Sequence, residues 1–238
     1  RLLTREGEIR IAKRIEEGLN QVKAALCLFP PTFDHLRISY EIIRAGEARL
    51  TDLLTGFVDP NAPDEIAQPN AKTQEEKDKE KAEDTGPDPA EADKRLKSIF
   101  RRQKRLMSTI ETDGREAKKV INAQQKLTGE LAEINLAPKL FEALCNNLRG
   151  TIGSIRQLEK QVMVICIREA GMARKEFIAS FPKNETNLNW VDKHIRAKRK
   201  YSSILSKMKP DIQRAQRKLQ AIKVETGMSI AEIKDVNR

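Results

Sequence analysis

The amino-acid sequence predicts an all-α fold, an irregular helical bundle interrupted by a flexible acidic insert. Apolar residues recur at spacings of three and four, which is the period of a helix with one buried face. Aromatic residues make up only 4% of the chain, and β-branched residues do not alternate with polar ones as they do in strands. Hydrophobic residues make up 39% of the 238 positions, which is enough for one or two cores. We therefore expect almost no strand.

The first predicted helix begins after Thr4, a good N-cap residue, and ends before Pro30 and Pro31. Its apolar residues fall at steps of three and four, which places them on one stripe of the helix. We therefore expect an amphipathic helix with a single buried face, formed by Ile11, Ile15, Leu19, Val22 and Leu26.

Two shorter helices are expected next, over about residues 32–45 and 50–56, with a bend at Gly46 between them. Both carry apolar residues at helical spacing, and Gly56 ends the second. The residues expected to face the core are Phe33, Leu36, Tyr40, Ile43, Leu50, Leu53 and Leu54.

Residues 61–88 are predicted to form the flexible acidic insert. They combine Pro, Asn, Ala and charged residues with almost no large apolar side chain, so folding cannot bury enough surface to offset the loss of chain entropy. From Asp59 to Asp93 the chain has twelve acidic residues against four lysines, a net charge of −8. Since the whole chain carries +10, the rest carries +18. The charge alternation in residues 75–81 could instead support a transient solvated helix.

Helical patterning resumes with a clear start signal, Asp88 as N-cap and Pro89 at the first helical position. A break at Asp113 and Gly114 separates the first two helices, and Gly171 ends a long one. In that long helix, Ile155 and Val162, and Leu158 and Ile165, repeat seven residues apart as a packing seam. The expected helices cover residues 90–112, 115–134, 138–170, 174–181, 188–195 and 198–226, with a kink or break at Pro210, and a capping box of Ser229 and Glu232 opens a final short helix.

The net charge of +10 favours a polyanionic partner, most simply nucleic acid. The stretch from Lys193 to Lys218 holds ten Lys or Arg residues and one acid, Asp211, and can lie against phosphates or an acidic protein face. Its simplest interpretation is a solvated helix surface. Only Trp190 and Tyr201 accompany it, which is too few aromatic residues for base stacking along a single strand.

Catalytic, metal and cofactor sites are not expected, and neither is an enzyme. The histidines, His35 and His194, have no Cys, Ser or carboxylate at a recognisable spacing. Cys27, Cys145 and Cys166 stand far apart and fit reduced, buried thiols of a cytoplasmic protein. No apolar run reaches the length of about 18 residues that a membrane span needs, and no signal peptide is visible. We therefore expect a soluble, cytoplasmic protein without a membrane partner.

The chain opens with the run LLTREGEIRIAKRIEEG at residues 2–18, and four shorter runs follow. The first run is similar to the second half of region 1.2 of the primary, or housekeeping, sigma factors of bacterial RNA polymerase. The others resemble the start and the end of the large non-conserved insert between regions 1.2 and 2.1 of that family. They are EARL at residues 47–50, LTGFVDPN at 54–61, ETGMSI at 225–230 and IKDVNR at 233–238.

The resemblance implies a layout for the chain. Residues 1–18 would be the end of region 1.2, residues 19–60 the first part of the non-conserved helical domain, residues 61–88 the linker and residues 89–238 the second part. It implies a helical domain that contacts the clamp of the largest polymerase subunit near promoter DNA and offers a surface to transcription regulators. Because the chain begins without Met and ends within a helical pattern, we expect it to be a piece of a longer protein.

Three DNA-binding residues are carried over from this resemblance. Glu8 matches a glutamate that helps line the pocket for a flipped base at the downstream end of the −10 element, and Leu2 matches a position near the discriminator strand. Arg49 matches an arginine that approaches the duplex just upstream of the −10 element. From the residues alone, Glu8 is a first-turn acid favoured by the helix dipole, and Arg49 a surface ion pair with Glu47 or Asp52.

The sequence is therefore consistent with two functions. The first is a fragment of a transcription initiation factor that supports contacts to −10 and discriminator DNA and binds the polymerase clamp. The alternative is a helical adaptor that binds an acidic protein or RNA through its basic C-terminal helix, residues 198–226. Binding to polymerase rather than to bulk RNA would distinguish the two.

Overall fold

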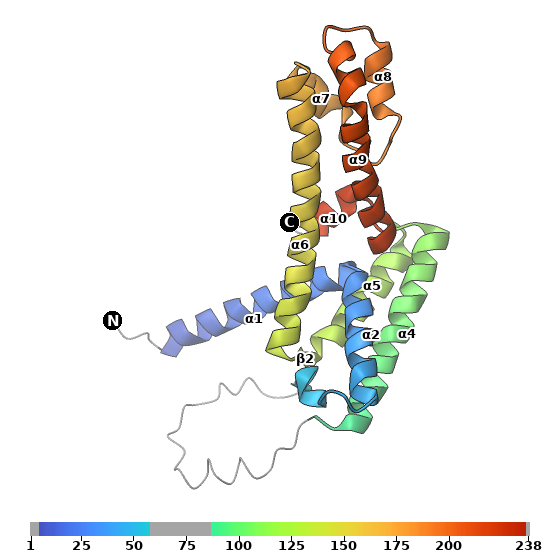
Figure 1. The fold of residues 1–238 in the computed structure, drawn as a ribbon. Coiled ribbons are helices and arrows are strands. Elements are labelled where there is room, and N and C mark those ends of the chain that lie inside the picture. The colour runs from blue at the N-terminus through green and yellow to red at the C-terminus, as the bar shows by residue number, and fades with distance from the viewer. Residues whose placement is uncertain (1–4, 58–86, 237–238) are drawn as a thin grey trace. The chain divides into compact units, whose positions relative to one another are not determined.

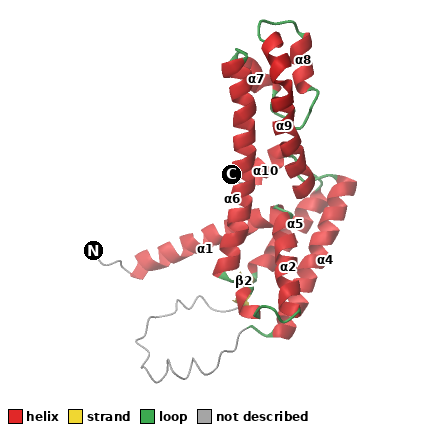
Figure 2. Ribbon diagram, in the orientation of Figure 1, coloured by secondary structure: helices red, strands yellow, loops and turns green. Residues whose placement is uncertain are grey.

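The computed structural model describes residues 5–57 and 87–236, which confirm the predicted all-α class (Figure 1 and Figure 2). The chain divides into two compact units. Unit 1 comprises Arg1–Leu28 and Thr32–Leu144, and unit 2 comprises Phe29–Pro31 and Cys145–Arg238. The helices are α1 Arg5–Leu28, α2 Pro31–Arg44, α4 Pro89–Asp113, α5 Lys118–Ala132, α6 Pro138–Met163, α7 Arg174–Ser180, α8 Trp190–Arg196, α9 Ser202–Thr226 and α10 Ile230–Val236.

Local sequence signals set several of these helix ends. The backbone N–H of Ala90 donates to the Asp88 carboxylate at 3.0 Å, with Pro89 at the first helical position, so the predicted start of α4 is confirmed. At the start of α10, the Ser229 N–H donates to the Glu232 carboxylate at 2.6 Å and the Glu232 N–H to the Ser229 hydroxyl at 3.3 Å. This is the predicted capping box. The predicted insert, residues 61–88, lies outside the described residues except for its last two positions.

The short helix predicted over residues 50–56 is wrong. A 3-10 turn at Leu50–Asp52 leads instead into strand β1, Leu54–Phe57, which pairs antiparallel with β2, Ile134–Leu136. A helix of two turns is weak without a partner, whereas the strand pair satisfies the backbone of both segments. Because β2 begins at Ile134, the preceding helix α5 ends at Ala132, two residues before the predicted end at residue 134. The partner strand lies about 80 residues away in sequence, so local periodicity could not indicate it.

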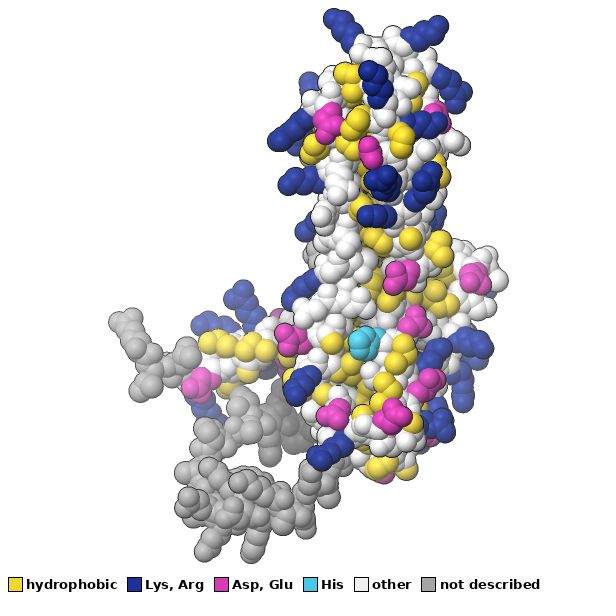
Figure 3. Space-filling model, viewed as in Figure 1, with side chains coloured by type: hydrophobic (Ala, Val, Ile, Leu, Met, Phe, Trp, Pro, Cys, Tyr) yellow, Lys and Arg dark blue, Asp and Glu magenta, His cyan; other side chains and the backbone are white. Residues whose placement is uncertain are grey.

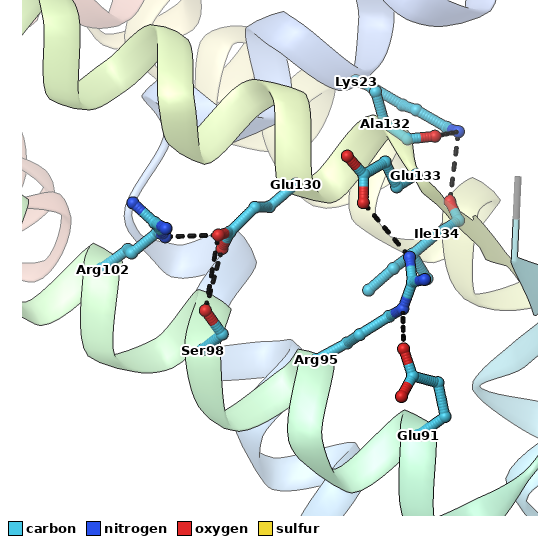
Figure 4. A network of polar contacts seen from close by, with 9 residues as sticks. All are labelled: Lys23, Glu91, Arg95, Ser98, Arg102, Glu130, Ala132, Glu133 and Ile134. Carbon is cyan, nitrogen blue, oxygen red and sulfur yellow. Dashed lines mark hydrogen bonds and ion pairs between the residues drawn. The ribbon is translucent and has the colours of Figure 1, made fainter. Parts of the chain in front are cut away.

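The prediction that α1 buries a whole apolar face is also wrong. The helix packs against α5 at its C-terminal part, where Leu26 is fully buried. There the Lys23 ammonium group donates to the carbonyl oxygens of Ala132 and Ile134, each at 3.2 Å (Figure 4). The rest of the predicted face is exposed, at 44% for Ile11, 58% for Ile15, 46% for Leu19 and 38% for Val22.

The core of unit 1 lies between α2, α4 and α5. The side chains that fill it come from all three helices. Arg95 of α4 lies at the edge of this core and links neighbouring elements through polar contacts. The Arg95 guanidinium pairs with Glu91 at 2.7 Å and with Glu133 at 3.2 Å (Figure 4). It also lies 4.7 Å from the centre of the Phe57 ring. Arg95 therefore ties β1 and the end of α5 to α4. The buried core residues include Phe33, Leu36, Leu96, Ile99, Leu127 and Leu131.

In unit 2, the packing seam predicted for the long helix over residues 138–170 is only partly present. Ile155, Leu158 and Val162 are buried as predicted, but Ile165 is only partly buried and Cys166 is fully buried in its place. The cause is a π-helical segment over Val164–Glu169, in which the Ala170 N–H donates to the carbonyl five residues back at 2.9 Å. A π turn holds one more residue than an α turn, so the buried position moves along by one.

Three glutamines of α9 hold the loop that precedes α8. Gln213 donates to the Leu188 carbonyl at 3.2 Å, and Gln220 to that of Thr186 at 2.8 Å. Between them, the buried Gln216 donates to the Asn187 carbonyl at 2.9 Å. Of the kink or break predicted at Pro210, the break is absent, because the helix that carries these side chains continues through this residue.

The buried His194 of α8 packs in the aromatic core of unit 2. Its ring centre lies 4.8 Å from that of Trp190, and its Nδ1 lies 3.9 Å from the carboxylate of Glu176. The pKa of His194 is lowered, mainly by burial. The nearby Lys193 ammonium also lowers it, and the Glu176 carboxylate partly opposes the shift. The Tyr201 hydroxyl donates to the same carboxylate, and burial with this hydrogen bond raises the pKa of Tyr201 to about 12. The lowered pKa therefore favours the neutral imidazole at pH 7.

Unit 2 should lose stability as the pH falls below about 6.5, the ordinary pKa of an unfolded histidine. The unfolded chain takes up a proton there, whereas folded His194 takes it up only at a lower pH. Urea unfolding followed by the fluorescence of Trp190, the chain's one tryptophan, between about pH 8 and 5.5 measures this. His194→Gln should flatten the dependence, and His35→Gln should not. A urea midpoint of unfolding that does not change with pH would contradict a lowered pKa of His194 in the folded protein.

Candidate functional site

Glu8 lies in the first turn of α1, and its side chain is exposed. Within the described residues it has no hydrogen-bond or ion-pair partner, so its carboxylate is available to a ligand. Neighbouring Glu6 is an exposed acid in the same turn. Leu2, the other residue expected near the −10 element, lies outside the described residues.

Arg49 lies directly before the 3-10 turn that leads into β1. Its backbone is extended, and its N–H donates to the Asp52 carboxylate at 3.2 Å. The exposed guanidinium forms no ion pair with Glu47, Asp52 or any other carboxylate of residues 5–57 and 87–236. The carboxylate that could have paired with Arg49 is therefore used to shape its backbone, and the cation is left to solvent.

The segment after Arg49 is fixed to the rest of unit 1. The Leu53 carbonyl accepts a hydrogen bond from the Ala137 N–H at 2.9 Å, and β1 then pairs with β2. Arg95 holds the far end of the strand through the Phe57 ring. The Glu91–Arg95 pair is visible in the sequence as an i, i+4 spacing, but the contacts to Phe57 and Glu133 are long-range and were not predictable.

Glu8 and Arg49 belong to separate elements, and no hydrogen bond or ion pair joins them. Each presents one unpaired charge to solvent from an ordered element, so the two form separate points of contact. Such an arrangement suits the docking of an extended partner better than the chemistry of a small substrate, which needs convergent groups.

The basic stretch in α8 and α9 is mostly exposed. Lys209 pairs with Asp192 at 2.6 Å, and Arg214 lies 3.5 Å from Asp211. The other cations of the stretch have no carboxylate partner among the described residues, and Figure 3 shows Lys and Arg side chains distributed over unit 2. They are Lys193, Arg196, Lys198, Arg199, Lys200, Lys207, Arg217 and Lys218.

The three cysteines, all among the described residues, are not in disulfides. Burial raises the pKa of Cys27 to about 11 and that of Cys166 to about 12. Such thiols are poor nucleophiles at neutral pH. In the ranges 5–57 and 87–236, no three His, Cys, Asp or Glu side chains gather as metal ligands would. None of the helices described combines the length and apolarity that crossing a bilayer requires.

Comparison with known proteins identifies the family. The family described as Sigma-70, non-essential region, matches residues 29–223, which include Arg49 but not Glu8. The chain is also 28% identical, over 259 aligned residues, to the RNA polymerase sigma factor RpoD of Neisseria gonorrhoeae. That alignment covers the whole chain and 40% of the relative, so the chain spans about two fifths of the relative's length. The chain therefore belongs to the Sigma-70 non-essential region family, which is not enzymatic.

Proposed function

We propose that the chain is the part of a primary sigma factor that supports contacts to promoter −10 and discriminator DNA and that binds the clamp of RNA polymerase. In this proposal residues 1–18 are the end of region 1.2, and residues 19–60 and 89–238 form the non-conserved helical domain on either side of the linker 61–88. Glu8 receives a flipped base, Leu2 lies near the discriminator strand, and Arg49 approaches the duplex upstream of the −10 element. Other surfaces of the domain would receive transcription regulators.

The observation that carries this proposal is the free guanidinium of Arg49 within the matched family region. Its only competing role, a surface ion pair, is not formed among the described residues, and its backbone is fixed by Asp52 and by β1. An exposed arginine on an ordered turn can neutralise a phosphate without reorganising. The similarity of the whole chain to a protein named as an RNA polymerase sigma factor supports promoter DNA as the partner.

If Arg49 neutralises one phosphate, Arg49→Ala should lower the salt slope of promoter binding by about one unit. The effect should be uniform across promoters, because a phosphate contact carries no sequence information. The measurement is the affinity of the holoenzyme for promoter DNA as a function of KCl concentration. The fold of unit 1 should be unaffected, since this side chain is exposed and forms no ion pair with a described carboxylate.

The matched control replaces Lys198, Arg199 and Lys200, three exposed cations between α8 and α9, with Ala. We expect this change to leave the salt slope unaltered. If the triple change lowers the slope and Arg49→Ala does not, the DNA-facing side of the domain has been assigned wrongly.

The exposed cations of α8 and α9 favour a second candidate, an adaptor that binds an acidic protein or RNA. This surface offers several cations without described carboxylate partners. A pull-down of the chain with core polymerase, compared with one using bulk RNA, separates the two functions. Retention on polymerase that survives Lys198, Arg199 and Lys200 replacement supports the sigma-factor role, and retention on RNA that these replacements abolish supports the adaptor.

A further inference from the structure

A groove between α4 and α5 is lined mainly by basic side chains. The two helices run antiparallel in unit 1 and are joined by a turn at Gly114, which has a φ of +78° (Figure 1). The groove has a volume of about 320 Å³, and no acidic residue lines it. Its lining residues are Arg102, Arg105, Lys119, Asn122, Ala123 and Lys126.

Two of these cations have no carboxylate partner within the described residues: Arg105 and Lys126. Arg102 is held by Glu130, which also accepts from the Ser98 hydroxyl at 3.2 Å (Figure 4). The Lys119 ammonium lies 3.9 Å from Asp113, at the limit of an ion pair, and its side chain is 84% exposed.

Such a concentration of like charge is costly unless an anion neutralises it. Residues 94–126 hold eleven Lys or Arg residues against three acids, Glu111, Asp113 and Glu116. Figure 3 shows Lys and Arg side chains along the outer edge of α4. The groove therefore lies in a strongly basic part of the two helices.

We infer that this groove is a binding site for the phosphate backbone of nucleic acid, formed by Arg102 and Arg105 on α4 and by Lys119 and Lys126 on α5. The inference goes beyond the proposed function, because it adds a contact on helices that carry neither Glu8 nor Arg49. Lys119 and Lys126 are two helical turns apart, a rise of about 10 Å. One strand of a duplex presents about three phosphates over that length.

The lining favours phosphates over an acidic protein. Protein interfaces are anchored by apolar or aromatic side chains in desolvated pockets, and the only apolar side chain here is that of Ala123. Two guanidinium groups, two ammonium groups and the amide of Asn122 supply the donors that backbone phosphates accept. The small side chain of Ala123 leaves room for the ligand between the cations of α4 and those of α5.

The test uses the whole 238-residue chain, without polymerase or a promoter, and a fluorescein-labelled duplex of arbitrary sequence. Anisotropy titrations between about 50 and 200 mM KCl give the affinity and its salt slope. The double change Arg105→Gln and Lys126→Gln should lower the slope by about 1.8 units and weaken binding by about one to two orders of magnitude at 0.1 M KCl. Circular dichroism should show an unchanged fold, because neither side chain has a described carboxylate partner.

The matched control, Arg174→Gln and Lys175→Gln on α7, removes the same charge from exposed positions and should leave the slope unchanged. A second variant, Ala123→Glu, keeps every cation but places a carboxylate in the groove, and should weaken binding as the double change does. Equal losses in the control and the groove variants would show that binding follows net charge alone and would overturn the inference. So would an unchanged slope, or tighter groove-dependent binding of a labelled poly-glutamate peptide than of the duplex. Since no polymerase is present, these outcomes are independent of the Arg49 experiment.

Discussion

Replacing Leu26 with alanine is expected to lower the free energy of unfolding by about 2–5 kcal/mol, the cost of a cavity where a large aliphatic side chain is removed from a core. Leu26 is fully buried at the end of α1 that packs against α5. Urea unfolding followed by far-UV circular dichroism measures the loss. The fluorescence of Trp190, which lies in unit 2, serves as a separate readout of the unit that does not contain Leu26.

The matched control is Ile15→Ala, on the same predicted stripe of the same helix. Ile15 is 58% exposed, so its truncation should change the free energy of unfolding by no more than about 0.5 kcal/mol. A loss at Ile15 as large as that at Leu26 would mean that the whole stripe is buried within this chain, as the sequence alone suggested. The contrast between the two variants therefore measures how far along α1 the core of unit 1 extends.

The helix positions were predictable wherever the signal is local. The cap at Asp88, the capping box at Ser229 and Glu232, and the stop at Pro30 act within a few residues of the helix end that they set. The apolar spacing of α2 also placed Phe33, Leu36 and Tyr40 correctly in the core. These features follow from the short-range geometry of the backbone.

The features that escaped prediction depend on residues distant in sequence. The pairing of β1 with β2, which replaces the predicted short helix, escaped prediction because the two strands are about 80 residues apart in sequence. The π-helical segment that follows α6 exchanges Ile165 for Cys166 in the core, a shift that no heptad pattern contains. Periodicity likewise predicts the stripe of α1, but it does not say which of its turns meet a neighbouring helix.

In the candidate site, too, the features that depend on long-range contacts were not predictable. Glu8 and Arg49 came from the resemblance to sigma factors, and the residues alone favoured a helix-dipole acid and a surface ion pair. The structure leaves Arg49 unpaired among the described residues, a result that depends on the Asp52 carboxylate binding the backbone instead. The groove between α4 and α5 was missed because its two rows of cations are 14 or more residues apart in sequence and meet only when the helices pack.

The measurement that tests the proposed role most directly is the lifetime of the open promoter complex formed by holoenzyme whose full-length sigma factor carries Glu8→Ala. If the exposed Glu8 carboxylate accepts hydrogen bonds from a base edge, its loss should cost about 1–3 kcal/mol and shorten the lifetime by about 5- to 150-fold. Binding to core polymerase should be unchanged. The matched control is Glu6→Ala, which removes an exposed acid from the same first turn and with it the same helix-dipole interaction. The proposal predicts a much shorter lifetime for Glu8→Ala than for Glu6→Ala; equal, small effects of the two changes would contradict it and return Glu8 to a helix-dipole role.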